Sequence, residues 1–419
     1  MRILLITDDF YPNSGGIAYT LKTLCENIKR TDHKLYIINP YYEGKNIFKK
    51  YVLKNKKLMK DFFNFKDKKF IRVLIFSTIL LIRNKTLKLK HRINLILYLL
   101  MRPSLFFAVF KNIEIILPLI EKLKIDLLLT GHSGDPLYIA LIIGKLKNLK
   151  VITLLHGLEL VIRNIFSLRT YYIQNADKII ISNPWIKKLA IKIHNIEESK
   201  IEIIHRGVVV KQLEIRKTKE ELRLKYNIPK SQFVLLSVGR HVERKNFNLV
   251  ILALKAIKEK IPDINIKYYL IGDGPDTNKL KNLAERLNLN DNITFLGRVD
   301  IKTRNEFYKL SDLFVMPSLS QKNSIEGFGI VFIEANFYKV PVIGTRSGGI
   351  KEAIVDGKTG FLINPNDLNQ LIERILYLYK NPEECINLGL NGYNRVIKEY
   401  NWDTIINDYI NIFESNVNI

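Results

Sequence analysis

Two glutamates, Glu326 and Glu334, have seven residues between them. Glu326 lies at a glycine-rich turn, and Glu334 lies in the apolar helix predicted to follow that turn. Eight steps of about 100° leave their side chains about 80° apart around the axis, so both can face one cleft. The first backbone N–H groups of a helix lack partners, and its dipole favours an anion such as phosphate there. With a following Gly348-Gly349 pair, this pattern favours an anion site over an ordinary strand–turn–helix with two solvated glutamates.

Other candidate residues follow predicted strands. Arg240 and Lys245 come after one apolar run, and a Gly272-Asp273-Gly274-Pro275 loop comes after the next. Ligands of parallel α/β sheets bind outside the carboxyl ends of the strands. His132 and His156 also follow strands, in the first half of the chain. A histidine there is either a structural hydrogen-bonding group or a catalytic one, and for His132 both interpretations stay open.

The elements that must position these residues alternate between short apolar runs and stretches with helical spacing. This alternation predicts an α/β protein with parallel sheets, and 419 residues allow two or three domains. The expected strands are 2–7, 34–39, 126–130, 151–155, 178–182, 201–204, 233–238, 266–271, 293–296, 313–317 and 340–344. The expected domains are an N-terminal domain at 1–207, a linker region at 208–232, a second domain at 233–398 and a closing helix at 399–419 that crosses back to the first domain.

The net charge of +25 favours polyanionic partners, namely phosphorylated substrates, anionic lipid or nucleic acid. Cys25 and Cys385 are far apart, which fits a reducing compartment without disulfides. The N-terminus enters a strand at once and lacks the pattern of a signal peptide. No apolar run reaches 18 residues, so we expect no membrane span.

Much of the positive charge lies in residues 45–111, which hold 18 Lys or Arg against two Asp. Apolar pieces interrupt the charge, and each is too short to span a bilayer. This basic segment predicts amphipathic helices that bind an anionic membrane surface. The alternatives are a solvated basic face over a helical core, or a nucleic-acid-binding surface.

Together these motifs resemble glycosyltransferase family 4, whose GT-B fold has two Rossmann-like domains facing across a cleft. The resemblance rests on five motifs along nearly the whole chain: Pro12-x-x-Gly15-Gly16, His156-Gly157-x-Glu159, Gly239-Arg240 with Lys245, Gly272-Asp273-Gly274-Pro275, and Glu326 with Glu334. The sequence from Gly272 to Leu362 is most similar to the phosphatidylinositol mannosyltransferases of that family. The basic segment departs from the family pattern, as does His205-Arg206-Gly207-Val208.

The resemblance implies a role for each matching residue. Arg240 and Lys245 would clamp the donor diphosphate, where fixed cations stabilise the charge that develops on the leaving group. Backbone N–H groups of Gly16, Phe328, Gly329 and Ile330 would add to this clamp, and Gly272 and Gly274 would lie at the donor site. Glu334 would accept hydrogen bonds from the ribose. Glu326 would bind hydroxyls of the transferred sugar, and His156 would lie near that sugar.

The implied activity is a retaining transfer of a hexose to a lipid-linked or polysaccharide acceptor in cell-envelope glycan synthesis, with mannose from GDP-mannose as the first candidate. We expect no cofactor, no metal and no nucleic-acid partner, and a cytoplasmic location at the inner face of the plasma membrane. The alternatives are an epimerase of sugar nucleotides on the same fold, a basic protein that binds membrane or nucleic acid, and a membrane-attached scaffold with an inactive site.

Overall fold

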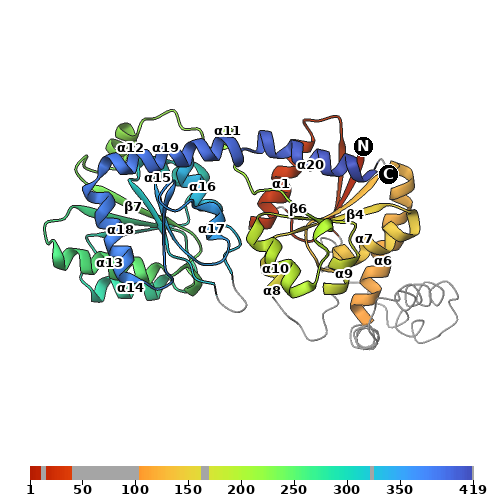
Figure 1. Ribbon diagram of the computed structural model, residues 1–419, viewed down its shortest axis with the longest axis horizontal. Helices are drawn as coiled ribbons and strands as arrows, with labels where there is room; N and C mark the ends of the chain where they lie inside the picture. Colours follow the sequence, from red (N-terminus) through yellow and green to blue (C-terminus); the bar gives the residue numbers. More distant parts are fainter. Residues whose placement is uncertain (11–15, 40–102, 162–168, 321–324, 418–419) are drawn as a thin grey trace, which may run out of the picture. The chain divides into compact units, whose positions relative to one another are not determined.

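The computed structural model describes residues 1–10, 16–39, 103–161, 169–320 and 325–417. They form two compact units. Unit 1 comprises Met1–Ile181, Ala190–Glu202 and Tyr409–Ile419, and unit 2 comprises Ser182–Leu189 and Ile203–Asp408. Each unit contains one six-stranded sheet (Figure 1). The strand pairs with a resolved register are parallel in both sheets, which confirms the predicted α/β class.

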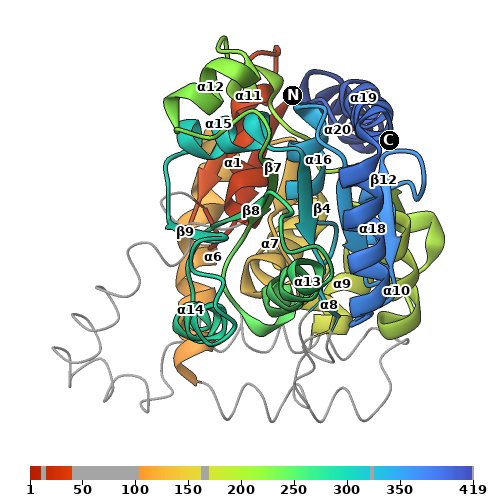
Figure 2. The same ribbon diagram turned by 90° about the vertical axis from the view of Figure 1, so that its left-hand side faces the viewer.

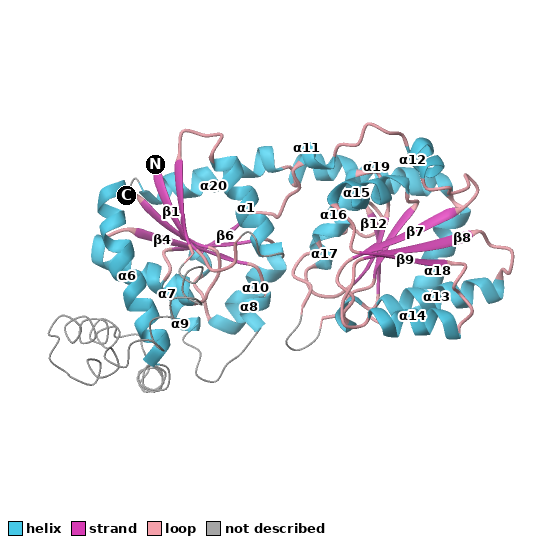
Figure 3. Ribbon diagram, turned by 180° about the vertical axis from the view of Figure 1, so that it is seen from behind, coloured by secondary structure: helices cyan, strands magenta, loops and turns pink. Residues whose placement is uncertain are grey.

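The sheet of unit 1 has the strand order β2-β1-β3-β4-β5-β6. Its strands are β1 (Arg2–Ile6), β2 (Lys34–Ile38), β3 (Leu127–Thr130), β4 (Lys150–Leu155), β5 (Lys178–Ile181) and β6 (Ile201–Ile203). Its helices are α1 (Gly16–Ile28), α6 (Pro103–Leu123), α7 (Asp135–Lys147), α8 (Leu158–Val161), α9 (Arg169–Asn175) and η1 (Glu198–Lys200), while α10 (Pro184–His194) and α20 (Trp402–Val417) each have residues in both units. Helices flank the sheet on both sides (Figure 3), so strands such as β3 are continuous buried apolar runs.

The sheet of unit 2 has the strand order β12-β11-β10-β7-β8-β9. Its strands are β7 (Phe233–Val238), β8 (Ile266–Ile271), β9 (Ile293–Gly297), β10 (Leu313–Met316), β11 (Val342–Thr345) and β12 (Gly360–Ile363). Its helices are α11 (Val210–Leu213), α12 (Lys219–Lys225), η2 (Glu243–Lys245), α13 (Phe247–Lys260), α14 (Thr277–Arg286), α15 (Ile301–Leu310), α16 (Ile330–Phe337), α17 (Ile350–Ala353), α18 (Leu368–Lys380) and α19 (Pro382–Glu399). Helix α13 lies beside α14 and α18, whereas α16 lies beside α15 and α19; Figure 2 shows α13 and α14 together and away from α12 and α15.

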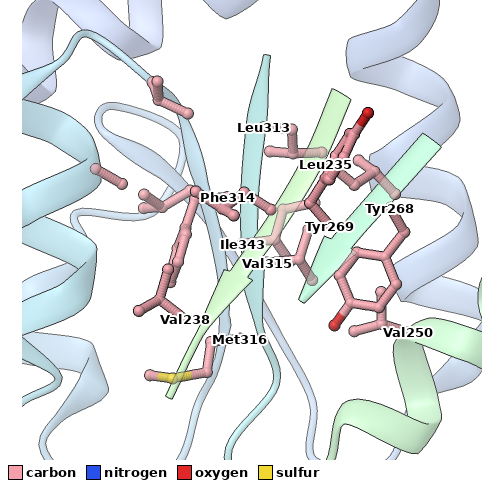
Figure 4. Packing of buried hydrophobic residues seen from close by; sticks show 14 of the residues in the cluster. Leu235, Val238, Val250, Tyr268, Tyr269, Leu313, Phe314, Val315, Met316 and Ile343 are labelled. Atoms are coloured by element: carbon pink, nitrogen blue, oxygen red, sulfur yellow. The ribbon is translucent and has the colours of Figure 1, made fainter. Parts of the chain in front are cut away.

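The core of unit 2 lies along its central strands (Figure 4). Leu235 of β7 and Phe314 of β10 are fully buried, and Tyr268 of β8 is buried beside them. The Tyr268 hydroxyl donates to Ser237 Oγ at 2.8 Å, and Ser237 in turn donates to the carbonyl of Val315. Because the hydroxyls of Tyr268 and Ser237 both have partners, the core buries them without an unpaired donor.

The region predicted as a linker, residues 208–232, contains two short helices, α11 and α12, within unit 2. A capping box begins α12: Thr218 Oγ1 accepts from the N–H of Glu221, and Glu221 accepts from the N–H of Thr218. Leu222 is buried on the inner face of this helix. The polar composition of the segment led to the prediction of a linker without a helix. The capping residues of α12, Thr218-x-x-Glu221, are nevertheless recognisable in the sequence.

Two further differences concern β12 and the basic segment. Strand β12 was not expected, because its run of four residues between turns is too short to show a period. Residues 45–102 of the basic segment lie outside the described residues, and its remainder begins α6. Within the described part of the chain, no helix combines the length and apolarity needed to cross a membrane.

Candidate active site

The strand order of unit 2 reverses between β7 and β10. From β7 the sheet continues to β8 and β9 on one side, and from β10 it continues to β11 and β12 on the other. Such a switch point opens a crevice outside the carboxyl ends of the two strands, where ligands of α/β sheets bind. Lys245 lies in η2 after β7, and Glu326 lies in the turn after β10. The sheet topology therefore brings together residues that are 81 positions apart.

Glu326 forms an ion pair with two cations. Lys245 Nζ lies 2.6 Å from Glu326 Oε2, and Arg244 Nη1 lies 2.5 Å from the same oxygen. The three side chains are largely buried, with exposed fractions of 14% for Glu326, 11% for Lys245 and 20% for Arg244. The sulfur of Met316, the last residue of β10, lies 3.2 Å from Lys245 Nζ. Positive and negative groups thus meet at the switch point of this sheet.

The charges of this cluster support one another. Burial raises the pKa of Glu326, but Lys245 and Arg244 beside it outweigh burial and lower the pKa to about 2. Burial lowers the pKa of Lys245, and the carboxylate of Glu326 opposes that effect. Glu326 is therefore ionised at neutral pH, and it can accept hydrogen bonds but has no proton to donate.

The turn that carries Glu326 is held through its backbone. The N–H of Gly349 donates to the carbonyl of Glu326 at 2.8 Å. A Cβ at Gly349 would lie 1.9 Å from the carbonyl oxygen of Gly327, so only glycine allows this approach. Phe328, predicted to offer its N–H to a phosphate, has a buried side chain, and Gly329 precedes Ile330 at the N-terminus of α16.

The Gly272-Asp273-Gly274 loop packs against the loop that follows β7. Gly272 has φ +125°, and a Cβ there would lie 1.9 Å from the carbonyl oxygen of Gly239. The N–H of His241 donates to the carbonyl of Asp273 at 2.8 Å, and a Cβ at Gly274 would lie 2.3 Å from the carbonyl oxygen of His241. Close packing of two backbone segments thus requires these glycines, whether or not a donor binds beside them.

Glu334 lies one turn inside α16 and is buried, with 7% of the residue exposed. Tyr308 of α15 donates its hydroxyl to Glu334 Oε2 at 2.9 Å, and Arg304 Nη2 lies 3.3 Å from Oε1. Neither partner was anticipated from the sequence. A buried carboxylate with a cation and a hydroxyl donor remains a fixed acceptor, which is what contact with ribose hydroxyls requires.

Two other predicted residues of the donor site are not members of this ion-pair cluster. Arg240 is exposed directly after Gly239, at the carboxyl end of β7. Gly16 is the first residue of α1 in unit 1. The predicted clamp of Arg240 with Lys245 therefore has one exposed and one buried cation, and Arg244 is a third cation that the motif did not include.

Unit 1 has its own switch point, between β1 and β3. Asp8 follows β1 and His132 follows β3, and Asp8 Oδ1 forms a hydrogen bond with His132 Nε2. His132 Nδ1 accepts from the N–H of Gly134 at 3.0 Å, so the ring hydrogen lies on Nε2 and is donated to Asp8. His156, after β4, donates from Nε2 to the carbonyl of Gly131 at 2.9 Å and is 8% exposed. These three side chains gather where a ligand of unit 1 would bind.

Sequence reasoning missed Arg244, Asp8 and the partners of Glu334. Arg244 directly precedes Lys245, so the signal was adjacency, but adjacency alone does not show that both side chains turn to one carboxylate. Asp8 stands at a strand end, as His132 does, and the same rule would have nominated it. Within the described ranges, no cluster of three or more His, Cys, Asp or Glu side chains is arranged to hold a metal ion.

Two family models match this chain. A model described as glycosyl transferases group 1 matches residues 218–395, and a model described as glycosyltransferase family 4 matches residues 14–212. An uncharacterized glycosyltransferase of Methanocaldococcus jannaschii is 27% identical over 98% of this chain and 97% of its own length. The N-acetyl-alpha-D-glucosaminyl L-malate synthase of Bacillus anthracis is 31% identical over 46% of this chain. A GDP-mannose-dependent alpha-(1-6)-phosphatidylinositol monomannoside mannosyltransferase of Mycolicibacterium smegmatis is 28% identical over 41% of it.

The chain spans only about half the length of the last two relatives, 48% and 45%. Among solved structures, a glycosyltransferase from Rickettsia africae superposes with a TM-score of 0.73 at 20% identity, over 99% of this chain and 98% of its own. The two models cover both sheet domains in turn, and the structural likeness extends over both. The chain therefore belongs to the glycosyltransferases that these two models describe, family 4 over residues 14–212 and group 1 over residues 218–395, and its fold is the two-domain GT-B fold.

Proposed function

We propose that the protein is a retaining glycosyltransferase that moves a hexose from a nucleotide sugar to a lipid-linked or polysaccharide acceptor in cell-envelope glycan synthesis. The observation that carries the proposal is the cluster of Lys245, Arg244 and Glu326 at the switch point of unit 2. A nucleotide sugar has an anionic diphosphate joined to a hydroxyl-rich ring. The cations match the diphosphate on one side of the bond that the reaction breaks, and the carboxylate matches the sugar hydroxyls on the other side.

In the proposed reaction the bond between the anomeric carbon and the donor phosphate oxygen breaks. The acceptor oxygen bonds to that carbon on the same face, and its proton passes to the leaving phosphate. Glu326 binds sugar hydroxyls, and Lys245 stabilises the charge that develops on the phosphate. Because Lys245, Arg244 and the N-terminus of α16 supply positive potential, we propose that donor binding needs no metal.

We propose GDP-mannose as the first donor to test. The motifs of unit 2 resemble those of the phosphatidylinositol mannosyltransferases, and the relative from Mycolicibacterium smegmatis is named as GDP-mannose-dependent. The name of the Bacillus anthracis relative points to N-acetylglucosamine instead. A thermal-shift panel should therefore contain GDP, UDP, ADP, GDP-mannose and UDP-N-acetylglucosamine, each with EDTA. A ligand at 100 times its dissociation constant adds about 2.7 kcal/mol to stability, which gives a clear shift.

Lys245→Met keeps most of the buried stem and removes the charge, so it should abolish the shift. Lys255→Ala is the matched control, because it breaks only a surface pair with Glu259. A shift that survives in Lys245→Met would remove Lys245 from the donor site. If no nucleotide shifts the wild type, the donor proposal itself fails.

On unit 1 we propose that Asp8, oriented by His132, binds the acceptor hydroxyl. Asp8→Asn should keep the nucleotide shift and lose transfer of labelled sugar to a lipid extract of bacterial membranes. Equal transfer by this variant and the wild type would contradict the assignment. Free sugar or an epimer formed without any acceptor would instead favour the epimerase alternative.

We also propose that residues 45–111 hold the enzyme at the inner face of the plasma membrane, because they contain 18 basic residues. Each Lys or Arg near an anionic surface contributes about 1 kcal/mol of attraction. The protein should sediment with phosphatidylglycerol vesicles at low salt and not with phosphatidylcholine vesicles. Comparable binding to DNA would favour the nucleic-acid alternative.

A further inference from the structure

Asn183 is a fully buried amide that belongs to none of the motifs above. It is the second residue after β5, in the segment Ser182–Leu189 that packs within unit 2. Its Oδ1 accepts from the N–H of Ile186 at 2.9 Å and so caps the first turn of α10. Its Nδ2 donates to the carbonyl of Gly327 at 2.7 Å. One end of the amide must accept and the other must donate, so the two contacts fix its orientation.

The carbonyl that Asn183 holds belongs to the residue after Glu326. The turn thus has two consecutive carbonyls with donors: Glu326 O receives the N–H of Gly349 at 2.8 Å, and Gly327 O receives Asn183 Nδ2. Fixing both peptide groups fixes the direction in which the side chain of Glu326 leaves the backbone. The ion pair with Arg244 and Lys245 then sets where the carboxylate ends.

The segment around Asn183 is itself anchored to the same turn. His205 donates from Nδ1 to the carbonyl of Ser182 at 3.2 Å. Its ring stands edge-on to Tyr400, with ring centroids 5.4 Å apart, and Tyr400 lies 5.5 Å from the ring of Phe328. Phe328 is the second residue after Glu326. The segment that carries Asn183 is therefore joined to the turn through the half-buried His205 and the buried rings of Tyr400 and Phe328.

We propose that Asn183 is a positioning residue for Glu326. The proposal rests on the proposed function, because Glu326 matters to turnover only if it binds the transferred sugar. Without the Nδ2 donor the carbonyl of Gly327 loses its hold on that segment, and the turn can shift. A displacement of about 1 Å in a group that orients a substrate costs on the order of 100-fold in rate.

Two variants separate positioning from folding. Asn183→Asp keeps an oxygen to cap α10 and replaces the donor with an acceptor that faces Gly327 O. Asn183→Ser also keeps a capping oxygen, adds no charge, and is too short to reach the turn. Asn248→Asp, on the exposed side of α13, is the matched control for added charge. Thermal unfolding of all three reports whether the fold is kept.

The probes are GDP with GDP-mannose and UDP with UDP-N-acetylglucosamine. Both Asn183 variants should bind the nucleoside diphosphate within threefold of the wild type, because its contacts with Lys245 remain. Their turnover of the sugar donor should fall at least tenfold, and the extra affinity of nucleotide sugar over nucleotide should disappear. Turnover within twofold of the wild type in both variants would reduce Asn183 to a helix cap. Failure of the wild type to bind any nucleotide would instead overturn the proposed function.

Discussion

Replacing Glu326 with glutamine tests whether the ion-pair cluster is charged and stabilising. The glutamine side chain would have nearly the same shape, but it would leave the buried ammonium of Lys245 and the guanidinium of Arg244 with a neutral partner. Both cations lie within 2.6 Å of the carboxylate oxygen whose charge the change removes. Breaking a buried pair on one side is destabilising because the remaining charge stays buried.

The magnitude follows from the pKa of Glu326, which is about 2 instead of its ordinary 4.5. At 1.36 kcal/mol for each pKa unit, ionisation of Glu326 stabilises the fold by about 3 kcal/mol at pH 7. Because the pKa in the folded state lies below that in the unfolded state, the stabilisation is complete above pH 4.5 and is lost as pH falls towards 2. At pH 3.5 about 2 kcal/mol should remain.

The assay is urea unfolding at pH 7 and pH 3.5, followed by tryptophan fluorescence. The chain has two tryptophans, Trp185 and Trp402, and both belong to unit 2, so the signal reports the unit that contains the cluster. Glu243→Gln, an exposed neighbour of the cations, is the control and should change stability by less than about 0.5 kcal/mol. Equal stability of Glu326→Gln and the wild type at pH 7, or a deficit that does not shrink at pH 3.5, would refute the reasoning.

Three further predictions concern the same unit. Arg244→Leu leaves Glu326 with one cation, so sugar-donor turnover should fall at least tenfold while nucleotide binding persists in titration calorimetry; an unchanged rate would exclude Arg244 from the site. Tyr308→Phe removes a hydrogen bond to a buried carboxylate and should lower the free energy of unfolding by about 2 kcal/mol, measured in urea, and a change below about 0.5 kcal/mol would argue against that bond. Gly272→Ala should lower the melting temperature by several degrees, since its Cβ would lie 1.9 Å from a backbone oxygen at φ +125°; a melting temperature equal to the wild type would contradict this loop geometry.

The elements were predictable because buried parallel strands are continuous apolar runs with polar turns at both ends. The strands at 233–238 and 266–271 begin and end where the sequence places them. The approach of Lys245 to Glu326 was also within reach, because strand ends of a parallel sheet share one edge. What the sequence could not show was the order of the strands, and hence which strand ends are neighbours.

The contacts that the sequence did not predict are mainly those between side chains of elements far apart in the chain. Glu334 was predicted to lie in an apolar helix, but Tyr308 and Arg304 lie on a different helix, and no local pattern joins them to it. Asn183 lies 144 positions from Gly327, and a lone asparagine before a proline is typical of a helix cap. Such contacts depend on the packing of whole elements, which local spacing does not encode.

The two glutamates of the spacing motif are not an acid–base pair, and the structure gives the reason. A general acid needs a pKa near the working pH, yet Glu326 has a pKa of about 2 and carries no proton to give. Its carboxylate is also engaged by two cations, which makes it a weak nucleophile and a weak base. Glu334 is buried against Tyr308 and Arg304. Both groups are therefore suited to accept hydrogen bonds from hydroxyls, which agrees with the proposed reaction, in which the proton of the acceptor passes to the departing phosphate.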